Sequence, residues 1–546
     1  MSDKKLRIIP LGGLGEVGKN MMAYEYGKNI LIVDTGLMFP DNDMLGIDYI
    51  IPDFQYLLDK THWVRGIVVT HGHEDHTGAI NHVLEHINAP IYATPLTRGL
   101  LEVKLSRGKM LSKTQLNTVQ AGETVNIGPF QVEFFHVCHS IPDGVGLGIT
   151  TPAGLIVHSG DYKFDHTPVD NWPTDYAKLA NLAGRGVLAL LADSTNADRA
   201  GWTPSERVID PAFSEVFRTA QGRIIVASFA SLISRMQQVG NAAMQHGRKM
   251  AFVGMSMVEN AKMARKLGYL NLPDELVISL DQALGMKPKD VVLMCTGTQG
   301  EPTSILGRLS VGTNRQFDVK QGDTIVLSSH PIPGNEEMVY RTINRLFRRG
   351  ANVIYEDIAP VHVSGHASQE EMKLLLHLVQ PQYFIPIHGE LRHLKQHAVI
   401  AHEVGIPDEN ITVIENGHVV EFQDGEMQLA ERIPGGYVFV DGAGVGDIGP
   451  SVVREREALA RDGFIFIHLT LNKDTCDLRE EPEIITRGFI YTRDEGDLLA
   501  ETKQFVEDAV RCGDGNPPKD LEQSIKSFLY SKTKRRPMVF VTISWV

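Results

Sequence analysis

His71-Gly72-His73-Glu74-Asp75-His76 is the stretch that decides the fold, because it places five potential metal ligands within six residues. It directly follows the run 66–70, Gly-Ile-Val-Val-Thr, which is short and rich in β-branched residues. Such a run predicts a buried strand that delivers the ligands on a loop at its carboxyl end. Alternate side chains of an extended segment share a face, so His71 and His73 can bind one ion while Asp75 and His76 turn toward a second. The HxHxDH pattern therefore predicts a two-metal site. A polar surface loop is disfavoured, because imidazoles and carboxylates seldom cluster this densely without a metal.

The length and composition of the chain bound its class. With 546 residues, of which 42% are hydrophobic, the chain can form two or three domains with separate cores. No apolar run reaches the roughly 18 residues needed to cross a membrane, and the first residues lack the apolar segment of a signal peptide. We therefore expect a cytoplasmic protein with no membrane partner.

Cysteine usage and net charge add two weaker constraints. The four cysteines, Cys138, Cys295, Cys476 and Cys512, are scattered and form no CxxC pair. This spacing argues against a disulfide framework or a thiolate zinc site, and predicts small buried residues in a reducing compartment. The formal net charge of −14 disfavours nucleic acid as a partner without excluding it, because net charge describes the whole surface and not one groove.

A glycine-rich run near the start, residues 13–18, matches the spacing of a dinucleotide-binding loop, with Asp34 at about the right distance to act as its acidic partner. Such a loop must open a helix, yet residues 20–33 are typical of a hairpin of two strands. We therefore disfavour the nucleotide interpretation. Asp34 ends the second strand and is better placed to hydrogen-bond the ligand loop from behind, although it could simply cap a turn.

Three further strand-like runs each end at a potential functional residue. Residues 130–137 lead to Cys138 and His139, which must point to opposite faces, and we choose His139 as the ligand because the first loop already supplies imidazoles. The strand 155–158 is followed by Asp161, where a carboxylate could bridge two metals or only form a turn. The strand 188–192 delivers Asp193.

Residues 204–356 form a second α/β segment that lacks an HxH cluster. Strand-like and helical runs alternate there, which predicts a parallel sheet. Potential ligands resume only afterwards, at His362, His366 and His388, and Ser368 with Glu371 predicts a capping box for the helix after His366. Ligands on both sides of the segment indicate a domain inserted into the first one, with a cleft between them.

The remaining chain predicts a linker and a small third domain. Glycines crowd residues 434–450, and the pattern after them is helix, strand, strand, helix, helix and strand. A basic cluster, Lys532, Lys534, Arg535 and Arg536, precedes the last strand and is either a solvated turn or a contact for RNA or a partner subunit. The predicted division is 1–203 (first domain, first part), 204–356 (inserted domain), 357–433 (first domain, second part), 434–450 (linker) and 451–546 (C-terminal α/β domain).

The order of these residues resembles a known superfamily. Asp34, HxHxDH, His139, Asp161 and His388, each after a strand-like run, are similar to the metallo-β-lactamase pattern, and Asp193, His366 and His388 match the additional motifs of its β-CASP nucleases. The runs 12–18, 139–143, 362–366 and 386–390 closely resemble the bacterial ribonuclease J family over essentially the whole chain. The resemblance implies an α/β fold, namely an αββα sandwich with an inserted parallel β-CASP domain and a small C-terminal α/β domain.

The resemblance also implies roles for the site residues. His71, His73 and His139 would bind one divalent ion, Asp75, His76 and His388 the other, and Asp161 would bridge them. Two such ions can activate a shared water for in-line attack on a phosphodiester, with His366, oriented by Asp193, as general acid or phosphate-positioning group and Asp75 within the catalytic set. Zn²⁺ is the favoured metal for imidazole-rich ligands, with Mn²⁺ or Mg²⁺ as alternatives.

A pocket for a 5′-monophosphate is expected beyond the metals. The positions that resemble the family's phosphate-binding residues are Ser228, Ser231, Arg235, His362, Ser364, Gly365 and His366. Arg235 would suit a bidentate grip on phosphate, but it could equally be an exposed helix residue. The loops 297–301 and 328–335 are further candidates for backbone and ribose contacts.

By resemblance, the expected function is that of a metal-dependent ribonuclease that degrades single-stranded 5′-monophosphate RNA from 5′ to 3′ and also cuts internally. Such an enzyme would act in mRNA decay and rRNA maturation, as a homodimer or homotetramer formed through the C-terminal domain. The alternatives are a β-CASP nuclease acting on DNA and a non-catalytic RNA-binding scaffold of the same fold. All seven metal ligands are present, which disfavours the scaffold.

Overall fold

The computed structural model of the protein describes residues 5–332, 334–475, 477–490, 495–511 and 520–546. The chain folds into two compact units: one comprises residues 1–39 and 49–438, and the other residues 40–48 and 439–546. Of the four cysteines, Cys138 and Cys295 are free and buried, as predicted, whereas Cys476 and Cys512 lie outside the described residues. Within the described part of the chain, no helix combines the length and apolar character needed to cross a membrane.

The larger unit is built on two facing sheets. The first has the order β22-β21-β1-β3-β4-β6-β7-β8 and the second the order β19-β13-β12-β11-β10-β9. A single buried core joins them, since Ile8 and Val33 of the first sheet belong to the same apolar cluster as Phe134 and Leu191 of the second. Helices α5, α12 and α13 pack on the outer face of the second sheet, and α4 packs beside β7 and β8.

The strands of the first sheet are β1 (Leu6–Gly12), β3 (Met21–Tyr26), β4 (Ile30–Val33), β6 (Val64–Val68), β7 (Ile91–Ala93), β8 (Leu116–Thr118), β21 (His418–Gln423) and β22 (Glu426–Arg432). Those of the second are β9 (Thr124–Ile127), β10 (Phe130–His136), β11 (Val145–Thr151), β12 (Gly154–His158), β13 (Val187–Asp193) and β19 (Tyr383–Ile387). The helices are α1 (Gln55–Leu58), α2 (Glu74–Thr77), α3 (Ile80–His86), α4 (Pro95–Arg107), α5 (Tyr176–Gly184), α12 (Gln369–Val379) and α13 (Leu391–Glu403). The predicted hairpin within residues 20–33 is confirmed as β3 and β4.

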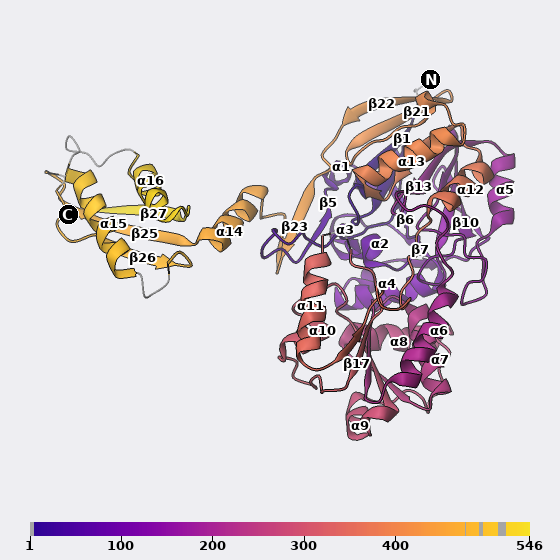
Figure 1. The fold of residues 1–546 in the computed structure, drawn as a ribbon. Helices are drawn as coiled ribbons and strands as arrows, with labels where there is room; N and C mark the ends of the chain where they lie inside the picture. The colour runs from indigo at the N-terminus through magenta and orange to yellow at the C-terminus, as the bar shows by residue number, and fades with distance from the viewer. Residues whose placement is uncertain (1–4, 333, 476, 491–494, 512–519) are drawn as a thin grey trace. The chain divides into compact units, whose positions relative to one another are not determined.

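An all-parallel sheet of five strands, in the order β15-β16-β14-β17-β18, lies between β13 and β19 in the sequence. Its strands are β14 (Ile224–Ala227), β15 (Lys249–Phe252), β16 (Val291–Cys295), β17 (Thr324–Leu327) and β18 (Asn352–Ile354). Its helices are α6 (Ile209–Thr219), α7 (Ile233–Gln245), α8 (Met255–Leu267), α9 (Leu280–Gly285), α10 (Ile305–Val311) and α11 (Glu336–Arg348), which gather around β17 (Figure 1). Both faces of the sheet are covered, α6 to α8 on one and α9 to α11 on the other, which explains why its strands are continuously apolar.

The smaller unit contains the sheet β26-β25-β27. Its elements are α14 (Pro450–Asp462), β25 (Phe464–Leu471), β26 (Glu483–Arg487), α15 (Glu495–Arg511), α16 (Leu521–Thr533) and β27 (Met538–Trp545). Alternate residues of β25, from Ile465 to Leu471, are fully buried beneath α15 and α16, which gives the unit its own core. The predicted element order of this domain is confirmed.

Two features of the chain differ from the expectation. Residues 434–450 are not irregular throughout, because they carry β23 (Tyr437–Asp441) and β24 (Gly444–Val445), which pair in an antiparallel hairpin. The segment 40–48 belongs to the smaller unit, where the Asp48 amide donates to the Val440 carbonyl at 2.9 Å. This contact joins residues that are far apart in the sequence, so no local sequence pattern predicts it. The boundaries that divide the larger unit at residues 203, 356 and 433 stay predictions.

The predicted capping box at the start of α12 is confirmed, and its glutamate has a wider role. Glu371 is fully buried and accepts hydrogen bonds from the backbone amides of Phe164 (2.8 Å), Thr203 (2.7 Å) and Ser368 (2.9 Å). One carboxylate therefore joins the start of α12 to two other segments of the larger unit.

We expect Glu371→Ala to lower the free energy of unfolding by about 3 kcal/mol, because three buried amides lose their acceptor. Urea denaturation followed by circular dichroism measures this change. The matched control is the neighbouring Glu370→Ala, which removes an exposed partner of Lys373 and is expected to cost no more than about 0.5 kcal/mol. Equal losses in the two variants would contradict the proposed role of Glu371.

Candidate metal centre

The ligand loop leaves β6 in an extended conformation and then turns into a helix. His73 still has extended backbone angles, φ −71° and ψ 158°, and it is the residue before α2. Asp75 and His76 lie on the single turn of α2, so the change from strand to helix, and not simple alternation, separates them from His71 and His73. The Asp75 and His76 carbonyls accept amides of the segment 20–35, which holds the loop in place.

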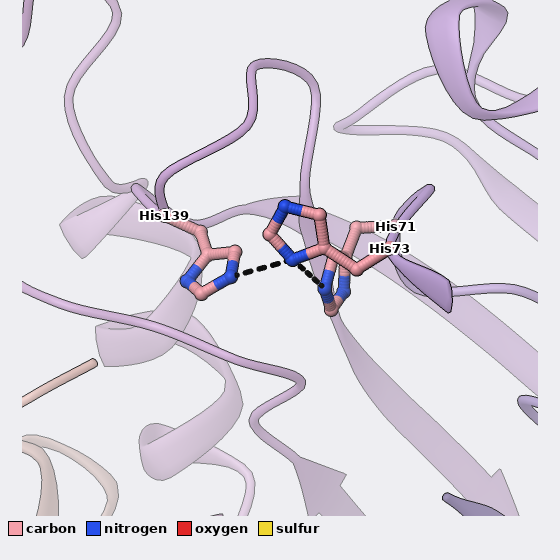
Figure 2. Close-up of side chains that lie close together, drawn as sticks. All are labelled: His71, His73 and His139. Carbon is pink, nitrogen blue, oxygen red and sulfur yellow. Dashed lines mark hydrogen bonds between the residues drawn. The ribbon is translucent and has the colours of Figure 1, made fainter. Parts of the chain in front are cut away.

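Three histidines converge at one end of this loop. The Nδ1 atom of His73 lies 3.1 Å from His71 Nε2 and 3.1 Å from His139 Nε2. Figure 2 shows the three rings with His73 between the other two. One nitrogen from each of the three rings lies within 4.8 Å of the others, a grouping that could hold a metal ion.

Four residues form a second cluster beside the first. Single ligand atoms of Asp75, His76, Asp161 and His388 all lie within 4.8 Å of one another. His76 Nε2 is 3.2 Å from Asp161 Oδ2, and His388 Nε2 is 3.3 Å from Asp75 Oδ2. Burial opposes protonation of both imidazoles, but Asp161 and the other carboxylates outweigh it and raise the pKa values of His76 and His388 well above the ordinary range.

Asp161 lies between the two clusters. Its Oδ2 atom is 3.6 Å from His71 Nε2 and 3.8 Å from His139 Nε2, in addition to its contacts with the second cluster. This oxygen is buried yet accepts no hydrogen bond among the described residues. A buried carboxylate oxygen that imidazole nitrogens surround without a well-formed hydrogen bond is costly unless a cation satisfies it, so the position fits a divalent ion on either side.

Asp34 supports the ligand loop from behind. Its Oδ1 atom accepts the Thr70 amide at 2.8 Å, and its Oδ2 atom accepts the Thr70 hydroxyl at 2.9 Å. The same Oδ2 lies 2.7 Å from His76 Nδ1. This contact fixes the ring so that Nε2 faces the second cluster, which is how carboxylates commonly orient metal-binding imidazoles.

His139, and not Cys138, faces the clusters. Cys138 Sγ points the other way, toward the Trp172 carbonyl at 3.4 Å. His139 Nδ1 lies 2.8 Å from the Gly365 carbonyl oxygen, so the ring orientation is fixed from the far side of the insertion. A Cβ atom at Gly365 would lie 2.6 Å from the His139 ring, so this close approach requires glycine.

Asp193 connects two histidines at the end of β13. Its Oδ2 atom lies 2.7 Å from His366 Nδ1, and its Oδ1 atom lies 3.3 Å from His388 Nδ1. Two donors hold the His366 carbonyl, the Thr203 hydroxyl at 2.7 Å and the Asn196 amide at 3.0 Å. The His366 ring is therefore fixed at both its backbone and its Nδ1 atom.

Burial and neighbouring charge give the imidazoles different protonation states. Burial lowers the pKa values of His71 and His139 well below the ordinary imidazole range, and lowers that of His73 to about 4. These three rings are therefore neutral near pH 7, the form that binds metals. Burial also lowers the pKa of His366, but the Asp193 carboxylate outweighs it and raises that pKa above the ordinary value.

The chain matches four family models along its length. They are the ribonuclease J β-CASP domain over residues 221–346, the ribonuclease J C-terminal domain over 451–546, the β-lactamase superfamily domain over 29–179 and the Zn-dependent metallo-hydrolase RNA specificity domain over 350–412. Ribonuclease J2 of Bacillus subtilis (strain 168) is 41% identical, and the alignment covers 99% of this chain and 98% of that protein.

The chain belongs to the ribonuclease J family. It is therefore a metal-dependent ribonuclease, and the predicted sandwich with its inserted β-CASP domain and C-terminal domain is confirmed. Ribonuclease J of Synechocystis sp. is 44% identical over 89% of this chain and 76% of that protein. A solved structure from Enterococcus faecalis V583, of a protein of unknown function, covers 78% of this chain and 100% of its own with a TM-score of 0.55. Its identity of 16% shows likeness of fold alone.

Three of the residues predicted to bind phosphate, His362, Ser364 and Gly365, lie within four residues of His366 in the chain, whereas Ser228, Ser231 and Arg235 come from the inserted segment. Ser364 Oγ accepts a hydrogen bond from Asn196 at 2.8 Å, and Ser228 is fully buried with its hydroxyl donating to the Phe229 carbonyl. Ser231 is half-buried at the start of α7. His362 Nδ1 is buried without a partner among the described residues, and burial lowers the pKa of this ring well below its ordinary value. Their role in phosphate binding stays a prediction, and Pro333 of the candidate loop 328–335 lies outside the described residues.

Arg235 is buried and internally paired. Its guanidinium donates to Glu206 Oε2 at 2.8 Å, to Gln238 Oε1 at 2.9 Å and to the Val361 carbonyl at 2.8 Å, and it also contacts the Ser328 hydroxyl. Glu206 precedes α6, Gln238 lies on α7, Ser328 follows β17 and Val361 follows β18, so one guanidinium joins four segments of the larger unit. The arginine therefore holds the segment before His362 in place, and it is not the exposed helix residue that the sequence also allowed.

Sequence reasoning missed several residues that surround the clusters. The Tyr24 hydroxyl lies 2.9 Å from the buried His158 Nδ1 behind the site, and the Thr195 hydroxyl lies 2.6 Å from His388 Nδ1. Asn20 donates its backbone amide to the Asp75 carbonyl at 2.9 Å. Position gives a usable signal for His158 alone, because it ends the strand that leads to Asp161.

We expect Arg235→Met to lower the free energy of unfolding by about 3 kcal/mol or more, because it leaves the buried Glu206 carboxylate without its guanidinium partner. Urea denaturation measures the loss, and exposed Arg207→Met is the control, with an expected change of no more than about 0.5 kcal/mol. Unchanged stability together with weakened binding of 5′-monophosphate RNA would instead show that Arg235 acts mainly on the phosphate.

Proposed function

We propose that this ribonuclease J binds two divalent ions, with Zn²⁺ as the favoured metal, and hydrolyses single-stranded RNA both from a 5′-monophosphate end in the 5′-to-3′ direction and at internal sites. The observation that carries this proposal is the position of Asp161, whose Oδ2 lies within 4 Å of ring nitrogens in both clusters. His71, His73 and His139 would hold one ion and Asp75, His76 and His388 the other. Bound ions of this kind lower the pKa of a water and stabilise the charged oxygens of the reacting phosphate.

The chain's own residues supply the rest of the chemistry. His366 lies at the edge of the clusters with Nδ1 engaged by Asp193 at 2.7 Å, so its Nε2 atom is the one left to donate a proton. The departing 3′-oxygen of the RNA needs that proton, and a histidine whose pKa is raised carries it near neutral pH. Asp193 fixes the ring and stabilises its charged form.

The cellular setting follows from the same reasoning. The family and the absence of a disulfide signal favour a cytoplasmic enzyme in mRNA decay and rRNA maturation. RNA phosphates would be held without regard to base identity, as in other enzymes that contact mainly the backbone. The separate core of the smaller unit makes it the candidate for self-association into dimers or tetramers.

We expect His366→Gln to lower kcat by about 10²- to 10⁴-fold with a normal RNA substrate, because the leaving oxygen loses its proton donor. The decisive comparison uses an RNA whose 3′-bridging oxygen is replaced by sulfur, since a thiolate leaves without protonation. The defect should shrink strongly with this substrate. An equal defect with both substrates would assign His366 to phosphate positioning and not to proton donation.

Two forms of one RNA test the direction of cutting. With 5′-monophosphate RNA we expect mononucleotides released from the 5′ end, whereas 5′-triphosphate RNA should be cut only internally, because the larger charged end does not fit a monophosphate pocket. Product lengths on a sequencing gel measure the difference, and a chelator should abolish both activities. Equal internal cutting of the two RNAs would contradict the proposed 5′-to-3′ exonuclease activity and indicate a purely endonucleolytic enzyme.

A further inference from the structure

The glycine-rich run that resembles a nucleotide-binding loop has a different place in the structure. It is followed by the strand β3 and not by a helix, and Lys19, at its end, is fully buried with its ammonium 2.7 Å from Glu16 Oε1. A phosphate-binding loop needs the amino terminus of a helix, and this run leads into a strand instead. The run 12–20 therefore needs another explanation.

One end of this run contacts the segment that carries His388. The short strand β2 (Leu14–Gly15) pairs in parallel with β20 (Gly389–Glu390), which begins directly after His388. Glu16 forms a further bridge with Gly389. His388 itself has a left-handed backbone with φ +53°, which a non-glycine residue adopts only when its surroundings hold it there.

The other end of the run contacts the loop that carries Asp75 and His76. The Asn20 backbone amide donates to the Asp75 carbonyl at 2.9 Å, and Asn20 Nδ2 lies 3.2 Å from His76 Nε2. Lys19, the preceding residue, donates its amide to the Leu37 carbonyl at 2.7 Å. This end of the run is therefore fixed to the HxHxDH side of the second cluster.

The buried ion pair joins the two ends. Glu16 lies on the His388 side, where its Oε1 also accepts the Gly13 amide at 3.1 Å and the Asn416 amide at 2.7 Å. Lys19 lies on the Asp75 side. The two charges are almost entirely shielded from water, so the ion pair resists separation and fixes the distance between the ends.

We propose that the Glu16–Lys19 ion pair and the strand pair β2–β20 are a positioning device that sets the metal affinity of the Asp75, His76, Asp161 and His388 cluster, with little effect on the His71, His73 and His139 cluster. The inference rests on the proposed two-ion function. It makes Glu16 and Lys19 positioning residues, because neither touches a metal ligand side chain directly.

The test measures Zn²⁺ binding to the metal-free full-length chain by competition with a chelating dye. We expect Lys19→Met to weaken the affinity for one of two ions by about 10- to 100-fold, because loss of other residues that support metal ligands has effects of this size. The affinity for the second ion should change by no more than about twofold. Thermal unfolding of each metal-free variant shows whether a change in affinity merely reflects a loss of fold.

Two further variants guard against a simple folding defect. Gly15→Ala adds a methyl group that would contact only Glu415 Cγ at 3.6 Å, so there is space for it, but the φ of +83° is unfavourable for alanine and should shift β2. It should weaken the same ion as Lys19→Met. Glu133→Gln is the matched control, because it neutralises a carboxylate that is as buried as that of Glu16 but lies in a different part of the unit, paired with Lys178 at 2.6 Å. This control should leave the affinities for both ions unchanged.

Double-mutant cycles identify the affected ion. When His388→Ala has already disabled the second cluster, Lys19→Met should have no further effect on Zn²⁺ affinity. When His73→Ala disables the first cluster instead, the losses of Zn²⁺ binding free energy from His73→Ala and Lys19→Met should add. If Lys19→Met weakens both ions equally, or neither, the positioning inference is wrong and the two-ion function stands. If the wild-type chain binds a single ion that does not depend on His388, the two-ion function itself is overturned.

Discussion

The parallel pairing of β13 with β19 is the constraint on which the rest of the site depends. Asp193 lies opposite Ile387 in this register, so the residue that follows, His388, arrives beside Asp193 although 195 positions separate the two in the sequence. Most of the residues between them, including the five-stranded parallel sheet, form the inserted α/β domain, and the chain returns through α12 to β19, the neighbour of β13. The second cluster therefore receives a ligand from beyond the insertion without any long-range loop.

Local patterns in the sequence carried much of this architecture. The HxHxDH run predicts a metal site by itself, because its potential ligands lie within six consecutive residues and no tertiary contact is needed to bring them together. Strand ends at His139, Asp161 and Asp193 could be predicted because apolar runs end where polar groups begin. The capping box at Ser368 was equally local. Each of these signals depends only on residues within one element and its adjoining turn.

Other features depend on partners that are distant in the sequence. Arg235 cannot be distinguished from a surface arginine until its acceptors, Glu206 and the Val361 carbonyl, are located in space. The glycine run 12–18 resembles a nucleotide loop because glycine permits any close backbone approach, and only the structure shows that a Cβ atom at Gly12 would lie 1.9 Å from the Lys19 carbonyl oxygen. The ligand loop was expected to be extended, with alternate side chains on opposite faces, but it forms a turn of helix that begins at Glu74.

The order in which the ligands occur has a consequence for biosynthesis. A ribosome releases the HxHxDH loop early, but His366 and His388 emerge only after the whole inserted domain has been made. A nascent or truncated chain that stops within the inserted domain lacks both His366 and His388, so its second cluster would be incomplete. On the proposed assignment of these residues, cleavage of RNA, including the message being translated, would wait until the central domain has been synthesised and its flanking strands have met.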